Sequence, residues 1–252
     1  MRELRNSYTE DFRIKSYEND VRQKLRLTTL FQYLQEVAGR HVTDTPVGYD
    51  ALEARGQFWV LVRIRARILR MPAWRDTVSV ETWAKRMDRM FAYREYEVRK
   101  DGELLIAATS EWMLMDRESR KPCRLSCLPA AMPLREEEGL AERIGKLVPA
   151  GRGLTSRKCV ARYSDIDMYH HVNNTKYIEW AMDCFEYSFL AGHEVEEIQI
   201  NFVAEVGPDE EVSVSLIGAL DENGLADALH YYIEGYNTAK QMKAFQMEVR
   251  LR

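Results

Sequence analysis

Apolar residues recur at intervals of three and four between residues 27 and 42. This spacing is typical of a helix with one buried face. The apolar positions are Leu27, Leu30, Phe31, Leu34, Val37, Ala38 and Val42. Thr28 or Thr29 is expected to cap the start of this helix, and Gly39 or Gly48 to mark its end. At about 1.5 Å per residue, the predicted helix is long enough to cross a sheet.

After this helix the pattern changes to a period of two. In residues 58–69, Arg63, Arg65 and Arg67 alternate with apolar residues, so one strand face is expected to be buried and the other basic. Residues 77–83, 93–99 and 104–115 have the composition of further strands. The sequence Lys-Asp-Gly at 100–102 predicts a turn between the last two. The pattern therefore predicts an antiparallel meander.

The second half of the chain repeats this order. Residues 177–189 again have helical spacing, with Asn173 or Asn174 as the expected cap and Gly192 as the expected stop. Strands are predicted at 198–204, 211–217, 228–234 and 241–251, with a turn at 221–224. Few residues are identical between the halves, so the predicted duplication depends on the order of elements.

Between the halves, residues 128–153 contain three prolines and the acidic run 136–138, which indicates a linker. We predict an N-terminal domain at 1–134, a linker at 135–152 with at most one short helix, and a C-terminal domain at 153–252. Each domain is expected to be a long helix wrapped by an antiparallel sheet. This is a tandem α+β architecture.

Composition excludes several functional classes. The 252 residues carry a net charge of −4, which gives no reason to expect nucleic acid as a partner. Four cysteines without paired spacing, and no recognisable leader, favour reduced thiols in the cytoplasm and give no ligand set for a zinc site. No stretch approaches the roughly 18 uninterrupted apolar residues of a membrane-spanning helix.

The densest polar segment is residues 165–174, which pack two carboxylates, two imidazoles and two amides into ten residues. Composition alone leaves a solvated turn and a reactive site about equally favoured. Asp165 is most simply a turn or cap residue, and His170 a solvated one. Asn173 and Asn174 are expected to cap the following helix first, with any substrate contact secondary.

Residues 165–178 resemble the active-site segment of the acyl-acyl-carrier-protein (acyl-ACP) thioesterases, which have a double hotdog fold. Other segments agree with strands of that family's first hotdog domain: 59–60, 72–78, 82–83 and 110–112. The resemblance extends from about Tyr8 to the end of the chain. It implies hydrolysis of a fatty acyl-ACP thioester to free fatty acid and carrier protein. No cofactor or metal is implied.

The family has the pattern Asp-x-Asn-x-His, followed by a Glu in the next long strand. Asp167 and His171 match the first and last positions, Tyr169 replaces the Asn, and Glu205 matches the Glu. No Gly-x-Ser-x-Gly motif supplies a serine nucleophile, and Cys184 lies on the apolar helical face and is expected in the core, so attack by water that a carboxylate activates is the leading mechanism. Glu205 is preferred as the base, with Asp167 and His171 orienting the water, and the choice between Asp167 and Glu205 is left open. A surface carboxylate before the turn at 207–209 is the simpler alternative for Glu205.

An amide at the helix start, Asn173 or Asn174, is expected to donate to the thioester oxygen. Laying Tyr17 on Tyr163 puts no such polar set in the first half, because Val21 then lies opposite Asp167 and Leu25 opposite His171. The prediction is therefore one active site per chain.

The first domain is then expected to supply apolar wall for the acyl chain. Trp59, Trp83 and Trp112 are core residues by default, and Trp59 is a candidate substrate contact. The basic strand face at 63–67 either attracts the acidic carrier protein or is simply solvated. A homodimer is left open.

Three other functions compete with acyl-ACP hydrolysis. One is an acyl-CoA thioesterase on the same fold. Another is a non-catalytic acyl-binding regulator, in which Tyr169 would mark the loss of activity. A hotdog dehydratase is disfavoured, because its site is built differently.

Overall fold

The structure is a computed structural model that describes residues 4–137, 139–140, 144–221 and 223–252. The chain divides into two compact units, Met1–Ile144 and Gly145–Arg252. Glu138 of the acidic run and Glu222 of the second predicted turn lie outside the described residues. So do residues 141–143 of the predicted linker.

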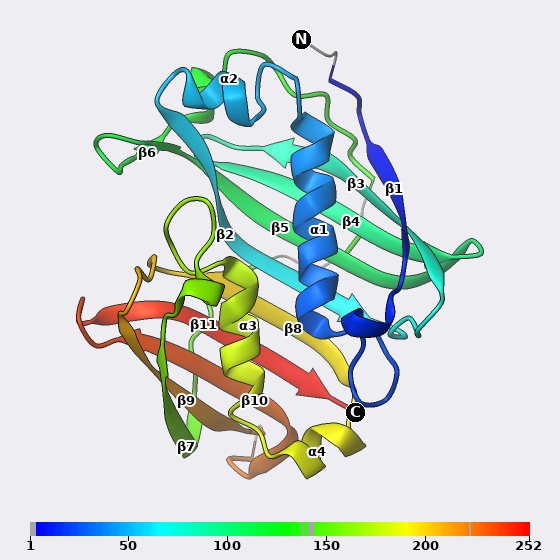
Figure 1. Cartoon of the computed structure of the whole chain (residues 1–252), viewed down its shortest axis with the longest axis vertical. Helices are drawn as coiled ribbons and strands as arrows, with labels where there is room; N and C mark the ends of the chain where they lie inside the picture. The colour runs from blue at the N-terminus through cyan, green and yellow to red at the C-terminus, as the bar shows by residue number, and fades with distance from the viewer. Residues whose placement is uncertain (1–3, 138, 141–143, 222) are drawn as a thin grey trace. The chain divides into compact units, whose positions relative to one another are not determined.

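The first unit contains one antiparallel sheet around a long helix (Figure 1). Its helices are α1 (Leu27–Val42), α2 (Tyr49–Glu53) and the short 3-10 helices η1 (Ser16–Glu18) and η2 (Leu125–Cys127). Its strands are β1 (Tyr8–Arg13), β2 (Gln57–Ile68), β3 (Thr77–Met87), β4 (Phe91–Lys100), β5 (Glu103–Asp116) and β6 (Pro122–Cys123). The strand order is β1-β3-β4-β5-β2, and β6 pairs with β5.

Helix α1 occupies the residues that the apolar spacing predicts, and its apolar face is buried. Leu30, Phe31, Leu34 and Val37 are each 0% exposed, and each such burial stabilises the fold by about 1.5–3 kcal/mol. The predicted caps were wrong. Arg26 is the N-cap, and the helix continues through Gly39 to Val42. The final turn is retained because His41 and Val42 are buried on the same face.

The strands of the first unit follow the predicted alternation. Ile64, Ala66 and Ile68 on β2 are at most 1% exposed. The predicted turn between β4 and β5 is confirmed by left-handed backbone at Asp101 (φ 50°) and Gly102 (φ 85°).

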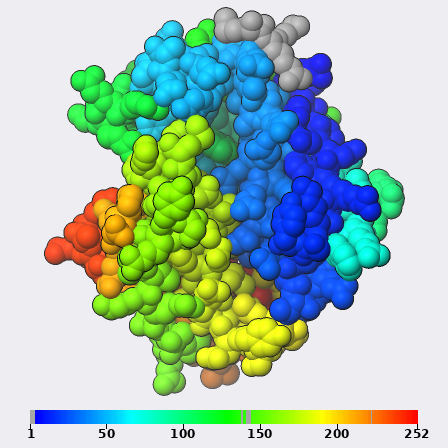
Figure 2. Space-filling view, viewed as in Figure 1, coloured from blue at the N-terminus to red at the C-terminus, as the bar shows by residue number. Residues whose placement is uncertain are grey.

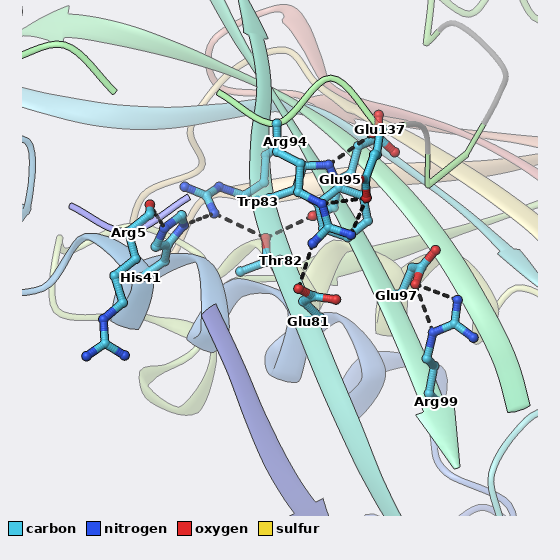
Figure 3. A network of polar contacts seen from close by, with 11 residues as sticks. Arg5, His41, Glu81, Thr82, Trp83, Arg94, Glu95, Glu97, Arg99 and Glu137 are labelled. Carbon is cyan, nitrogen blue, oxygen red and sulfur yellow. Dashed lines mark hydrogen bonds and ion pairs between the residues drawn. The ribbon is translucent and has the colours of Figure 1, made fainter. Parts of the chain in front are cut away.

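A polar network in the first unit was not predicted (Figure 3). The buried Arg94 donates to His41 Nδ1 at 2.8 Å and to Thr82 Oγ1 at 3.1 Å. Since an arginine only donates, His41 Nδ1 must accept, and its Nε2–H donates to the Arg5 carbonyl at 2.8 Å. The network joins β3 and β4 to the end of α1.

The second unit has the same plan. Its strands are β7 (Gly151–Val160), β8 (Val195–Phe202), β9 (Glu211–Leu220), β10 (Ala226–Asn237) and β11 (Met242–Leu251), in the antiparallel order β7-β9-β10-β11-β8. Its helices are η3 (Tyr163–Asp165), α3 (Asn174–Met182) and α4 (Tyr187–Gly192). Strand β7 begins inside the segment predicted as a linker, and the described residues of that segment form no helix.

The single helix predicted at 177–189 was wrong, because α3 and α4 are separate. The Glu186 backbone is extended (φ −66°, ψ 141°), and it starts α4 in a new direction. This break lets Phe185 and Phe189 stack at 5.7 Å while both meet the Tyr231 ring edge-on. Helical periodicity continued across the break because Phe185, between the two helices, and Phe189, in α4, both pack on Tyr231 of β10.

Candidate active site

The polar segment at 165–174 forms a tight turn between η3 and α3. Its ends are joined by a bridge between Ile166 and Val172 and by a hydrogen bond from the Asn173 N–H to the Asp165 carbonyl at 2.8 Å. Inside the turn, the Asp167 N–H donates to the His171 carbonyl at 2.9 Å, and the His170 N–H donates to the Asp167 carbonyl at 3.0 Å. The turn therefore presents the side chain of His171 in a fixed direction.

The Asp167 carboxylate shapes this turn. Its Oδ1 atom accepts a hydrogen bond from the Tyr169 N–H at 2.9 Å. His170 has left-handed backbone (φ 63°) and is exposed, as predicted, and Tyr169 is 44% exposed. The segment that carries the turn, yellow-green in Figure 2, lies at the molecular surface.

The structure brings His171 together with Glu205. The Val172 N–H donates to the Val206 carbonyl at 2.9 Å, which places the turn beside the segment that follows β8. His171 Nε2 consequently lies 3.2 Å from Glu205 Oε2. The side chains are 31% and 39% exposed, so solvent reaches both. Glu205 was expected in a strand, but β8 ends at Phe202.

The helix start is capped by Asn173. Its Oδ1 atom accepts from the Thr175 N–H at 3.0 Å and from the Thr175 hydroxyl at 2.7 Å. This resolves the predicted choice of cap, and Asn174 is the first residue of α3. Because Oδ1 is used by the cap, the Nδ2 group of Asn173 is the part of the amide that can donate to another molecule.

Asp165 has the structural role expected of it. Its Oδ2 atom accepts from the Arg162 N–H at 2.8 Å, and its Oδ1 atom lies 3.6 Å from Lys176 Nζ. The first contact caps η3, and the second links η3 to the start of α3. These contacts account for Asp165 without a catalytic role.

Cys184 is a buried core residue, as expected. Burial raises the pKa of the Cys184 thiol to about 11. The thiol therefore stays protonated near neutral pH and is a poor nucleophile.

The first unit contains the same turn with different side chains. The Asp20 N–H donates to the Lys24 carbonyl at 2.7 Å, and Asp20 Oδ1 accepts from the Arg22 N–H at 2.9 Å. Gln23 takes the left-handed backbone (φ 59°) that His170 has in the second unit. The Leu25 N–H donates to the Pro72 carbonyl at 2.8 Å, as Val172 does to Val206.

These contacts correct the predicted alignment of the halves. Asp20 corresponds to Asp167 and Lys24 to His171, not Val21 and Leu25. The alignment was wrong by one residue because it was based on Tyr17 and Tyr163, whose side chains are 68% and 97% exposed and therefore do not belong to the core that the two halves share. Met71, which precedes Pro72, corresponds to Glu205.

Trp59, Trp83 and Trp112 lie against the core of the first unit. Trp83 is 1% exposed, and the Trp112 N–H donates to the Ser110 hydroxyl at 2.8 Å. Trp59 is partly buried against two apolar clusters, and its N–H donates to the Val47 carbonyl at 3.0 Å. On the basic strand face, Arg63 is paired with Glu111. That residue is therefore not a free positive charge.

Among the described residues, no helix has the length and apolar composition to cross a membrane.

Comparison with protein families identifies both units. Residues 5–127 match the model of the acyl-ACP thioesterase N-terminal domain, and residues 152–247 match that of the C-terminal domain. A palmitoyl-acyl carrier protein thioesterase from Gossypium hirsutum is 30% identical over 234 residues, which cover 86% of this chain and 56% of that protein. An oleoyl-acyl carrier protein thioesterase from Arabidopsis thaliana is 30% identical over 227 residues, which cover 81% and 61%. The chain thus spans little more than half of these relatives, both named as chloroplastic.

Solved structures show the fold. A crystal structure of an acyl-ACP thioesterase from Bacteroides thetaiotaomicron has a TM-score of 0.85 at 23% identity, covering 98% of both chains. A 12:0-ACP thioesterase from Umbellularia californica has a TM-score of 0.79 at 20% identity, covering 98% of this chain and 94% of that one. The predicted tandem hotdog fold is confirmed. With both halves matched in order, the chain belongs to the acyl-ACP thioesterase family.

Proposed function

We propose that this protein hydrolyses the thioester that joins a fatty acyl chain to acyl carrier protein, as a step of fatty acid biosynthesis. The observation that carries the proposal is the contact between His171 Nε2 and Glu205 Oε2 at 3.2 Å, next to the start of α3. Family membership supplies the substrate class. The contact supplies a carboxylate and an imidazole that solvent can reach.

In the proposed reaction, Glu205 is the general base and His171 orients the attacking water. The water oxygen bonds to the thioester carbonyl carbon, and Glu205 takes a water proton. The carbon–sulfur bond then breaks, the carrier's thiolate leaves, and the proton held by Glu205 passes to it, which returns Glu205 to its basic form. The products are a free fatty acid and the carrier thiol, and no cofactor is required.

The carbonyl oxygen gains negative charge in this step and needs a donor. We assign that role to an amide at the start of α3, with Asn173 Nδ2 preferred because the capping bonds fix its orientation. One such donor typically lowers the barrier by about 3–4 kcal/mol. Asn174 is the alternative donor.

Asp167 and Tyr169 complete the proposed site through the turn. Asp167 orients His171, and Tyr169 occupies the position where the family has Asn. In the first unit, Trp59, which packs against two apolar clusters, is the proposed contact for the acyl chain. Because Lys24 and Met71 stand in the places of His171 and Glu205, we propose one active site per chain.

The test is turnover of one acyl chain on two carriers, acyl-ACP and acyl-CoA, with free fatty acid measured by mass spectrometry. We expect release from acyl-ACP, and a series of chain lengths gives the preference. Faster release from acyl-CoA would favour the CoA thioesterase instead. Binding of acyl-ACP without release would favour a non-catalytic regulator. Light scattering on the same sample decides between a monomer and the homodimer.

A further inference from the structure

Glu205 lies in irregular backbone, so its position needs support from outside the sheet. Strand β8 ends at Phe202 and β9 begins at Glu211. The N–H groups of Val203 and Ala204 donate to the Ala244 carbonyl, and the peptide group that joins Glu205 to Val206 lies beyond these bonds. Side chains bind this peptide group from both ends.

Tyr177 binds its N–H end. The Val206 N–H donates to the Tyr177 hydroxyl oxygen at 3.2 Å, and Tyr177 and Val206 are 2% and 0% exposed. The Tyr177 ring is held by Trp180 at 5.7 Å and by Phe245 at 5.3 Å between centroids. The hydroxyl is therefore a rigid acceptor. Burial raises the pKa of Tyr177, and the charges of Asp167 and Glu210 raise it further, so the hydroxyl stays protonated.

Lys240 binds the carbonyl end. Its Nζ donates to the Glu205 carbonyl at 2.8 Å and lies 3.1 Å from Glu210 Oε2. Glu210 is fixed in turn, because the same oxygen accepts from the Gly207 N–H at 2.8 Å and from Asn237 Nδ2 at 2.7 Å. The ammonium group is thus held between a carboxylate and the carbonyl of Glu205.

The first unit serves as an internal control. There Asp76 has the role of Glu210: its Oδ2 accepts from the Ala73 N–H at 2.9 Å, and its Oδ1 lies 2.6 Å from Lys100 Nζ. The position of Val206 is taken by Pro72, which has no N–H to donate, and that of Tyr177 by Leu30, which has no hydroxyl. The hydroxyl contact therefore occurs in the second unit, where the carboxylate of Glu205 precedes it, and not in the first, where the corresponding residue is Met71.

We propose that Tyr177 and Lys240 are positioning residues that hold the Glu205–Val206 peptide group, and through it hold the Glu205 carboxylate against His171. This inference rests on the proposed function, in which Glu205 is the base. Without either contact, the irregular segment samples other conformations and Glu205 leaves His171 for part of the time. The loss should appear in kcat rather than in KM, because no contact with the acyl chain is removed.

The variants are Tyr177→Phe, Lys240→Met and Lys240→Arg, with Tyr231→Phe as the matched control. Tyr231 also uses its hydroxyl for one backbone bond, to the Ala228 carbonyl at 2.7 Å, but that bond lies elsewhere in the unit. We expect kcat to fall about tenfold or more in Tyr177→Phe and Lys240→Met, with KM nearly unchanged. Lys240→Arg should keep most of the wild-type kcat, because arginine also donates. The kcat of Tyr231→Phe should equal that of wild type.

A double-mutant comparison separates positioning from general stability. In a Glu205→Gln background, adding Tyr177→Phe should lower kcat no further, since the group being positioned is already gone. A further tenfold loss in that background would overturn the proposal. So would wild-type kcat in both Tyr177→Phe and Lys240→Met.

Failure of the proposed function would look different. Wild-type turnover in Glu205→Gln, or no turnover by the unaltered protein, would refute the site and not the contacts. In that case, amide hydrogen exchange tests the contact of Tyr177 with the Val206 N–H. Tyr177→Phe should speed exchange of the Val206 amide and leave the Ile233 amide in β10 unchanged. An unchanged rate at Val206 would overturn the inference without any activity measurement.

Discussion

His171 and Glu205 meet because one backbone hydrogen bond joins their neighbours. The Val172 N–H donates to the Val206 carbonyl at 2.9 Å, and the two side chains that precede these residues then face each other, with His171 Nε2 3.2 Å from Glu205 Oε2. The corresponding bond from Leu25 to Pro72 in the first unit brings Lys24 and Met71 to the same places. The same backbone hydrogen bond therefore occurs in both units, but it brings together an imidazole and a carboxylate in the second unit and a lysine and a methionine in the first.

Removal of either member of this pair should abolish most turnover. Glu205→Ala and His171→Ala are each expected to lower kcat by at least about 100-fold, because each removes a group that acts on the water. Since the two act as a unit, the double variant should be little worse than either single one. Steady-state hydrolysis of acyl-ACP measures all three. Wild-type rates in the single variants would contradict the assignment.

Substitutions at Asp167 should separate its hydrogen bond from its charge. Asp167→Ala loses the acceptor for the Tyr169 N–H and should lower turnover by about 100-fold, because the turn no longer fixes His171. Asp167→Asn keeps an oxygen at that place and should retain clearly more activity. Equal losses in the two variants would mean that the negative charge itself takes part. Asp20→Ala is the matched control, since it breaks the same turn in the first unit.

Tyr169→Asn restores the residue that the family has at this position. The Tyr169 side chain is 44% exposed, and its N–H, which any residue supplies, makes the turn contact. We expect activity to be preserved or improved if the position only orients water. Comparison of kcat for acyl-ACP hydrolysis tests this. A severe loss would show that the phenol has a role of its own.

Glu210→Gln should make the free energy of unfolding depend less on pH. Burial alone would raise the pKa of Glu210, but bonds from the Gly207 N–H, Asn237 and Lys240 lower it below the ordinary 4.5. A carboxylate with a lowered folded-state pKa stabilises the fold above its unfolded pKa, and this stabilisation disappears as the pH falls through the folded value. The variant should therefore be less stable by about 1–2 kcal/mol at pH 7.

The difference between Glu210→Gln and wild type should shrink as the pH falls below 4.5. Urea unfolding at several pH values measures it. Glu234→Gln is a suitable control, because Glu234 also pairs with a lysine, Lys243, but binds no part of the 205–210 segment. A constant difference at all pH values would mean that Glu210 acts through packing and not through its charge.

Local periodicity was sufficient for much of the fold. The spacing of apolar residues predicted helix α1 and its buried face, although not its caps, and alternation placed Ile64, Ala66 and Ile68 in the core. Both features depend only on which side chains share a face of one element. Periodicity failed at Glu186, where α3 and α4 separate, because packing of Phe185 and Phe189 on Tyr231 decides that break.

For the site, the sequence alone determined which residue types are available: Asp167, His171, Tyr169 and Asn173 around one turn, and Glu205 farther along the chain. Tertiary structure decided which of them meet. The bond from Val172 to Val206 selects Glu205 as the partner of His171, and Tyr177 and Lys240 bind the peptide group that carries it. These contacts join segments far apart in sequence. Spacing along the chain cannot report them, since they depend on how the turn, α3 and the end of β8 pack together.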